Sequence, residues 1–85
     1  MNVINLVLYG RQACHLCEEM LNALREMDQS GIFKVEIVDI DTDPNLQKKY
    51  AARIPLLAVA DTGEIVAEYF LDADKINLLL EHSSV

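Results

Sequence analysis

Basic residues are few in this sequence. Seven Lys and Arg stand against fourteen Asp and Glu, which gives a formal net charge of −7. A protein that binds nucleic acid usually gathers positive charge on one face, so this balance argues against a nucleic-acid partner. Long hydrophobic runs are also missing, because the apolar stretch at residues 3–9 is too short to span a membrane and has no basic lead. We therefore expect a cytoplasmic protein that contacts no membrane.

Cysteine is scarce and tryptophan is absent. The two cysteines, Cys14 and Cys17, are separated by two residues. A small domain stapled by structural disulfides usually contains four or more cysteines, and in a reducing cytosol a close pair is more often catalytic. A zinc site needs four ligands, and no second CxxC completes one. His15 and His82 make a Cys2His2 set formally possible, although they lack the usual spacing, so redox, metal-binding and structural roles all stay open here.

The rest of the composition is that of a folded protein. The chain has 85 residues, of which 52% are hydrophobic and 25% are charged. This length suits one domain, and the composition is typical of a globular chain with its own core. We expect a single domain over residues 1–85 that is a monomer.

The two cysteines lie where a predicted strand turns into a predicted helix. The apolar run at residues 3–9 predicts a strand that is buried on both faces, and Gly10 ends it. A helical spacing of apolar residues follows the pair, at Leu16, Met20, Leu21, Leu24 and Met27. A helix N-terminus carries partial positive charge and free N–H groups, so a thiol there loses its proton more easily. One helical turn also brings Cys17 within disulfide reach of Cys14, which suits making and breaking one bond.

The remaining pattern alternates helices and strands. Asp43 and Pro44 predict a helix start, Asp61-Thr62-Gly63 predicts a turn, and Asp72 is a suitable helix cap. The predicted strands are residues 3–9, 33–40, 56–60 and 64–70, and the predicted helices are residues 14–29, 44–51 and 72–82. The order is βαβαββα, and a strand, a helix and a strand suggest a parallel pair with a right-handed crossover.

This order, with CxxC at the first strand–helix junction, resembles the thioredoxin superfamily and, within it, the small glutaredoxin-like proteins. Residues 7–17 look like the glutaredoxin strand, loop and helix start, with a basic residue, Arg11, three places before the first cysteine. The resemblance implies an α/β, thioredoxin-like fold. Its four-stranded mixed sheet has the order 2-1-3-4, the last two strands run antiparallel to the first two, and helices cover both faces.

The resemblance also assigns roles to residues. It implies that Cys14 is the nucleophile and Cys17 the resolving thiol. It implies that Ile54-Pro55 is the family's cis-proline, which lies beside the disulfide.

The chain departs from the family in two places. His15-Leu16 replaces the Pro-Tyr that glutaredoxins usually have between their cysteines. Residues 69–74 lack the Gly-Gly turn that helps glutaredoxins hold glutathione, although the acids, including Asp72, are present. Dithiol chemistry is therefore better supported by the sequence than glutathione binding.

Four basic residues are expected near the cysteines in such a fold. They are Arg11, Lys48, Lys49 and Arg53. They are placed to stabilise a thiolate and to hold a carboxylate of a glutathione-like tripeptide. A protonated His15 would favour the thiolate in the same way. The alternative is ordinary helix solvation for Lys48 and Lys49, and an exposed side chain without a role for His15.

We therefore predict a thiol–disulfide oxidoreductase with no bound cofactor. Its substrates are protein or small-molecule disulfides, and it takes electrons from glutathione as co-substrate or from a thioredoxin-type reductase. The predicted substrate contacts are Arg11, His15, Lys49, Arg53, Ile54, Pro55 and Asp72. Two alternatives remain: a partner-binding module without catalysis, and a metal or iron–sulfur carrier that uses Cys14 as a ligand in a dimer.

Overall fold

The computed structural model describes residues 3–28 and 31–83, without the side chains of His82 and Ser83. Its elements follow the predicted order, with one short 3-10 helix in addition. They are β1 (Ile4–Gly10), α1 (His15–Met27), β2 (Phe33–Asp39), the 3-10 helix η1 (Ile40–Thr42), α2 (Pro44–Tyr50), β3 (Leu56–Val59), β4 (Ile65–Glu68) and α3 (Ala73–Ser83). The predicted end of the first helix, at Gln29, lies outside the described residues.

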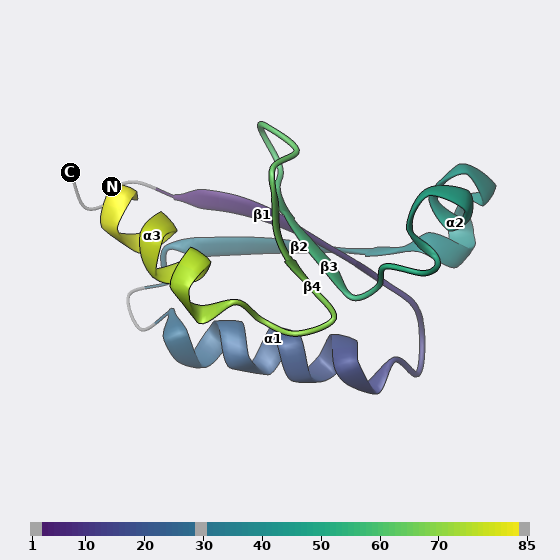
Figure 1. Ribbon diagram of the computed structural model, residues 1–85, viewed down its shortest axis with the longest axis horizontal. Coiled ribbons are helices and arrows are strands. Elements are labelled where there is room, and N and C mark those ends of the chain that lie inside the picture. The colour runs from purple at the N-terminus through teal and green to yellow at the C-terminus, as the bar shows by residue number, and fades with distance from the viewer. Residues whose placement is uncertain (1–2, 29–30, 84–85) are drawn as a thin grey trace.

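The four strands form one mixed sheet in the order β2-β1-β3-β4. The β1 strand pairs with β2 in parallel and with β3 antiparallel, and β3 pairs antiparallel with β4. These observations confirm the predicted fold class. Figure 1 shows β1 near the centre of the sheet, with its end leading through a loop into α1. The C-terminal end of β1 therefore delivers the chain to the cysteine motif.

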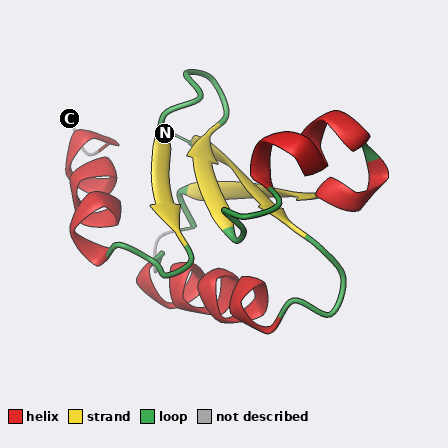
Figure 2. Ribbon diagram, turned by 45° about the vertical axis from the view of Figure 1, so that its right-hand side comes forward, coloured by secondary structure: helices red, strands yellow, loops and turns green. Residues whose placement is uncertain are grey.

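Each face of the sheet buries its own cluster of apolar side chains. Alternate residues of a strand point to opposite faces, so Leu6 and Leu8 of β1 lie on one face and Tyr9 on the other. The first face packs against α1 through Met20 and Leu24, and against α3. The second packs against η1 and α2, with Ile40, Tyr50, Leu56 and Ala58 as its buried members. Figure 2 shows α1 and α3 together on one side of the sheet and α2 on the other.

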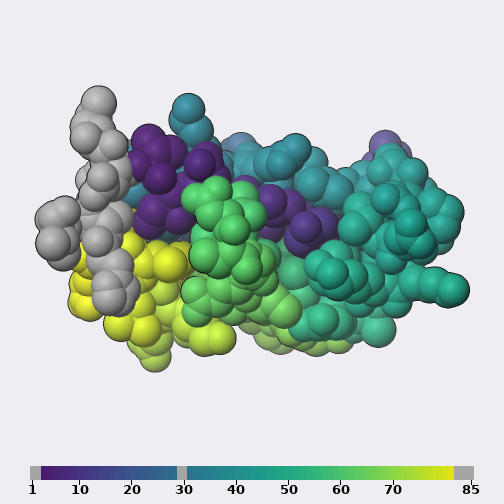
Figure 3. All heavy atoms as spheres, turned by 90° about the horizontal axis from the view of Figure 1, so that it is seen from above, coloured from purple at the N-terminus to yellow at the C-terminus, as the bar shows by residue number. Residues whose placement is uncertain are grey.

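The cover of the second face is short, because α2 has only seven residues. In Figure 3 it occupies one end of the molecule, and atoms of β1 and β2 are visible beside the β3–β4 hairpin. Within the part of the chain that the structure describes, no helix has the length and apolar character needed to cross a membrane.

Local signals explain most of the element boundaries. Asp43 accepts a hydrogen bond from the Asn45 N–H and precedes Pro44, so the predicted helix start is confirmed. Asp72 accepts from the N–H groups of residues 74 and 75, as predicted for a cap. The β4 strand is shorter than predicted and ends at Glu68, because Tyr69 takes a left-handed conformation with φ of 65°. A left-handed residue breaks the extended backbone that a strand requires.

Candidate active site

Cys14 lies at the point where the loop after β1 becomes α1. It is the N-cap of that helix, with the extended backbone that an N-cap normally has. The Cys17 N–H donates a hydrogen bond of 3.1 Å to the Cys14 Sγ, so the sulfur takes the place that a Ser or Asp oxygen fills in other caps. The Cys14 sulfur thus accepts a hydrogen bond from an N–H that has no acceptor within the helix, at the positive end of a 13-residue helix.

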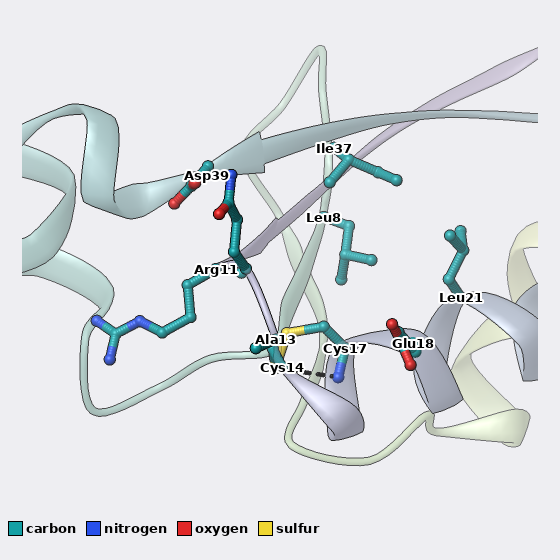
Figure 4. Close-up of a pocket in the computed structure, with 11 residues that line it drawn as sticks. Leu8, Arg11, Ala13, Cys14, Cys17, Glu18, Leu21, Ile37 and Asp39 are labelled. Carbon is teal, nitrogen blue, oxygen red and sulfur yellow. Dashed lines mark hydrogen bonds between the residues drawn. A yellow bond between two sulfur atoms is a disulfide. The ribbon is translucent and has the colours of Figure 1, made fainter.

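Cys14 and Cys17 are joined by a disulfide, with their Cα atoms 5.2 Å apart. Both residues are half-buried, so the bond is neither sealed in the core nor fully exposed. Both cysteines line a pocket of about 350 Å³. Figure 4 shows Leu8, Leu21 and Ile37 around it, and Arg11 lines it as well.

The Ile54–Pro55 peptide bond is cis, as the family resemblance implied. Tyr9 is paired with Leu56 in the sheet, and this register brings Pro55 to the end of β1, where the loop to Cys14 begins. Pro55 itself is fully buried, and its carbonyl accepts a hydrogen bond from the Tyr69 N–H. The fold therefore brings the X-Pro segment, the end of β1 and the β4–α3 loop together.

Two of the four predicted basic residues are paired with carboxylates. Arg11 lies 3.3 Å from the Asp41 carboxylate, and Arg53 bonds to the Glu68 carboxylate. The hydrogen bond from Arg53 lowers the pKa of Glu68, and the same bond raises the pKa of Arg53. Neither guanidinium is therefore an unoccupied anion site, because an incoming carboxylate would compete with one already in place.

The other predicted contacts have local partners. His15 lies 3.1 Å from Glu19, one helical turn away, and its side chain is 82% exposed. Lys49 sits over the Tyr50 ring at 5.2 Å, and that ring stacks on Tyr9. Burial, followed by the effects of the neighbouring Tyr50, raises the pKa of Tyr9. Asp72 uses its carboxylate on its own helix start, as described above. The predicted roles of these residues toward substrate stay predictions.

The β4–α3 loop contributes residues that the sequence did not single out. The Tyr69 hydroxyl donates to the Ala52 carbonyl, so this side chain crosses from the loop to the segment before the cis-proline. Phe70 is 72% exposed, and Leu16 and Tyr69 are partly exposed beside it. These three residues line a pocket of about 250 Å³ together with residues of α1. The signal was present as two adjacent aromatic residues in the place of the Gly-Gly turn.

Metal ions require sets of ligand side chains. Among the described residues, no three or more His, Cys, Asp or Glu side chains lie close enough together to hold a metal ion. The His82 side chain, which the Cys2His2 alternative needs, lies outside the described part of the chain.

The geometry predicts an acidic Cys14 thiol in the reduced protein. Since the sulfur faces an N–H at a helix N-terminus, its thiolate is stabilised, and we expect Cys14 to ionise below the usual cysteine pKa of about 8.5. Thiolate absorbance against pH, measured in Cys17→Ser, gives this value directly. The matched variant Cys14→Ser reports Cys17, which should titrate at a higher pH. Equal titration of the two thiols would contradict the prediction.

Comparisons with known proteins agree with this geometry. The family model of the Glutaredoxin-like domain (DUF836) matches residues 5–81. The solution structure of protein Ne2328 from Nitrosomonas europaea is 37% identical, with 93% of each chain covered and a TM-score of 0.83. An X. campestris protein is 30% identical over 91% of this chain and 96% of its own, with a TM-score of 0.66. No curated protein matches the sequence.

Thioredoxin 1 from Thermosipho africanus shares the fold at 15% identity, with 96% of this chain and all of that chain covered and a TM-score of 0.61. A glutaredoxin-like thioredoxin fold that carries a CxxC pair supports a redox function in general. With the family model covering nearly all of it, the chain belongs to the family of glutaredoxin-like domains.

Proposed function

We propose that this chain is a thiol–disulfide oxidoreductase in which Cys14 is the nucleophile and Cys17 the resolving thiol. One observation carries the proposal: the Cys14–Cys17 disulfide lies at a helix N-terminus, where the Cys14 sulfur accepts the Cys17 N–H. The same donor stabilises a thiolate at Cys14 once the bond is reduced. Cys17 has no matching position, because it lies one turn inside the helix.

The reaction is two successive thiol–disulfide exchanges. The Cys14 thiolate attacks one sulfur of a substrate disulfide, forms a mixed disulfide and releases the other sulfur as a thiolate. The Cys17 thiolate then attacks the Cys14 sulfur and releases the second substrate thiolate. The substrate gains two electrons and two protons overall, and the chain is left with the Cys14–Cys17 disulfide. An external dithiol or two molecules of thiol restore the reduced pair.

Protein disulfides are the substrates that we propose first. The surface beside Leu16 presents the exposed aromatic rings of Tyr69 and Phe70, and apolar side chains of a partner protein would bury against them. The guanidinium groups expected to hold glutathione are instead paired with Asp41 and Glu68. Glutathione and a thioredoxin-type reductase both stay in the proposal as electron sources, and no bound cofactor is needed. We place the activity in the cytoplasm, where a close cysteine pair cycles between its two states.

A single-turnover experiment tests the proposal. The reduced chain is mixed with an equal amount of a peptide dimer, two peptide chains joined by one accessible disulfide, and thiols are trapped with acid at increasing times. We expect two peptide thiols to appear for each Cys14–Cys17 disulfide formed. The chain should reduce the peptide faster than a small dithiol at the same concentration does. A rate no higher than that of the small dithiol would sink the proposal and favour a partner-binding module.

A further inference from the structure

Gly10, the last residue of β1, lies directly against the resolving sulfur. A Cβ added at Gly10 would sit 2.7 Å from the Cys17 Sγ and 3.4 Å from the Cys17 Cβ. Real Cβ atoms essentially never come closer than 3.0 Å to a heavy atom outside their own residue and its chain neighbours. The backbone at Gly10 does not itself require glycine, because positive φ angles among the described glycines occur at Gly31 and Gly63. The absent side chain is therefore needed for space, and Cys17 occupies that space.

The disulfide holds the Cys17 sulfur in this position. Its bond to Cys14 fixes the sulfur at one end, and Cys14 is itself fixed as the N-cap of α1. In the oxidised protein the Cys17 side chain therefore has no second rotamer by which it would avoid an added methyl group at residue 10. Moving the backbone is the remaining way to relieve the contact, and Gly10 is buried in the sheet, where such movement is costly.

In the reduced protein, the Cys17 side chain can move away from this contact. Once the bond is broken, the Cys17 side chain is free to rotate about its χ1 angle. The pocket beside it has about 350 Å³ of space and is walled by Leu8, Leu21 and Ile37 (Figure 4). Ile37 is 61% exposed at the edge strand β2, so the mouth of this pocket is open. A thiol fits in these surroundings, since an uncharged cysteine behaves as a small apolar side chain.

We infer that the missing side chain at Gly10 selectively stabilises the oxidised form, so that Gly10 sets the dithiol–disulfide equilibrium of the Cys14–Cys17 pair. Gly10 is a positioning residue, because it acts through the resolving sulfur of Cys17. This inference rests on the proposed function, in which the pair cycles between two states. The equilibrium involved is balanced: two chain thiols and one oxidised glutathione give the chain disulfide and two reduced glutathione molecules.

The test measures this equilibrium in Gly10→Ala. The protein is incubated in glutathione buffers of graded ratio, and its free thiols are alkylated and counted by mass spectrometry. We expect the equilibrium constant to shift toward the dithiol by roughly tenfold or more, the size expected for overpacking by one methyl group. A constant equal to that of the unmodified chain would overturn the inference, because a purely structural role destabilises both forms alike.

Two control variants separate the contact from general damage. Gly63→Ala adds a Cβ that meets nothing within 4 Å, at a position with φ of 75°. We expect it to destabilise both redox forms equally and leave the equilibrium constant unchanged. A shift as large as that of Gly10→Ala would overturn the inference.

The second control removes the sulfur. In Cys17→Ala the atom that a residue-10 Cβ would strike is gone, so adding Gly10→Ala should change the melting temperature much less than it does in the oxidised chain. If Gly10→Ala lowers the melting temperature of the Cys17→Ala chain as much as it lowers that of the oxidised chain, the inference fails. Gly10→Ala should also fold when the Cys14–Cys17 pair is reduced, and failure to fold in that state would overturn the inference as well. A chain that equilibrates normally with glutathione but does not reduce the peptide disulfide would refute the proposed function and leave this inference standing.

Discussion

In Cys14→Ser, thiol–disulfide exchange is expected to fall to the uncatalysed background, a loss of roughly a hundredfold or more. The first step of the proposed reaction is attack by the Cys14 thiolate, and a serine hydroxyl is not ionised near neutral pH. Serine also has about the size of cysteine and is among the best N-cap residues, so the start of α1 should remain in place. The loss should therefore appear in the rate and not in the fold.

The measurement is the single-turnover reaction with the disulfide peptide, followed by release of peptide thiols. Cys17→Ser is the matched control, because it also removes one thiol and the disulfide but retains the proposed nucleophile. It should still consume peptide disulfide in one round, whereas Cys14→Ser should not. If Cys14→Ser reacted at the rate of Cys17→Ser, the two roles would be reversed or shared, and the proposed mechanism would be wrong.

Local signals in the sequence were sufficient for most of the fold. The apolar run before Gly10 predicted the first strand, and Asp43 with Pro44 predicted the start of α2. The run also predicted burial on both faces, whereas only the face with Leu6 and Leu8 is fully buried. Such signals act within a few residues, so they are readable without knowing the tertiary structure. The strand order and the cis Ile54–Pro55 bond came from family resemblance, because composition contains no information about either.

The end of β4 shows where local signals failed. Tyr69 and Phe70 are good strand formers, so the pattern extended the predicted strand to residue 70. In the structure Tyr69 has φ of 65°, a conformation that a tyrosine rarely adopts without support from its surroundings. That support is tertiary: its N–H donates to Pro55 and its hydroxyl donates to Ala52, both distant in sequence.

The candidate site was predictable in its cysteines and not in its electrostatics. Cys14 and Cys17 are three residues apart, so one helical turn fixes their distance. Arg53 precedes β3 and Glu68 ends β4, so only the fold brings this pair together. Counting basic residues near the motif therefore identified the cations and missed the carboxylates that pair with them. The clearance at Gly10 has the same origin, since it depends on where α1 places Cys17 against β1.

In Cys17→Ser, a mixed disulfide at Cys14 is expected to persist long enough to be isolated. In the unmodified chain the neighbouring Cys17 thiol resolves it at an effective concentration of about millimolar or higher, set by one helical turn. Without Cys17, only an external thiol can cleave the mixed disulfide. With external thiol at about micromolar concentration, its lifetime should lengthen by roughly a thousandfold. Intact mass spectrometry after mixing with the disulfide peptide should show one peptide half per chain.

The same variant distinguishes protein substrates from glutathione. Since Arg11 and Arg53 are already paired with acids, we expect oxidised glutathione to form its adduct more slowly than the peptide. Charge reversal at Arg11 and Lys49, or added salt, should then change the glutathione rate little. A glutathione adduct that forms fast and slows markedly with salt and with both reversals would instead establish a tripeptide site at these cations, and our choice of substrate would be wrong.

Tyr69→Gly in the Cys17→Ser background tests whether the Tyr69 ring blocks the access of glutathione to Cys14. Glycine adopts the φ of 65° found at this position without a steric penalty, so the loop should keep its course while the bridge to Ala52 is lost. Removing the ring opens the surface between the β4–α3 loop and the cis-proline segment, and also removes an apolar contact proposed for protein partners. The glutathione rate should therefore rise while the peptide rate falls. Tyr69→Phe, which loses only the hydroxyl, should retain the peptide rate, and a fall in that variant as large as in Tyr69→Gly would show that the hydrogen bond to Ala52, not the aromatic surface, controls access to Cys14.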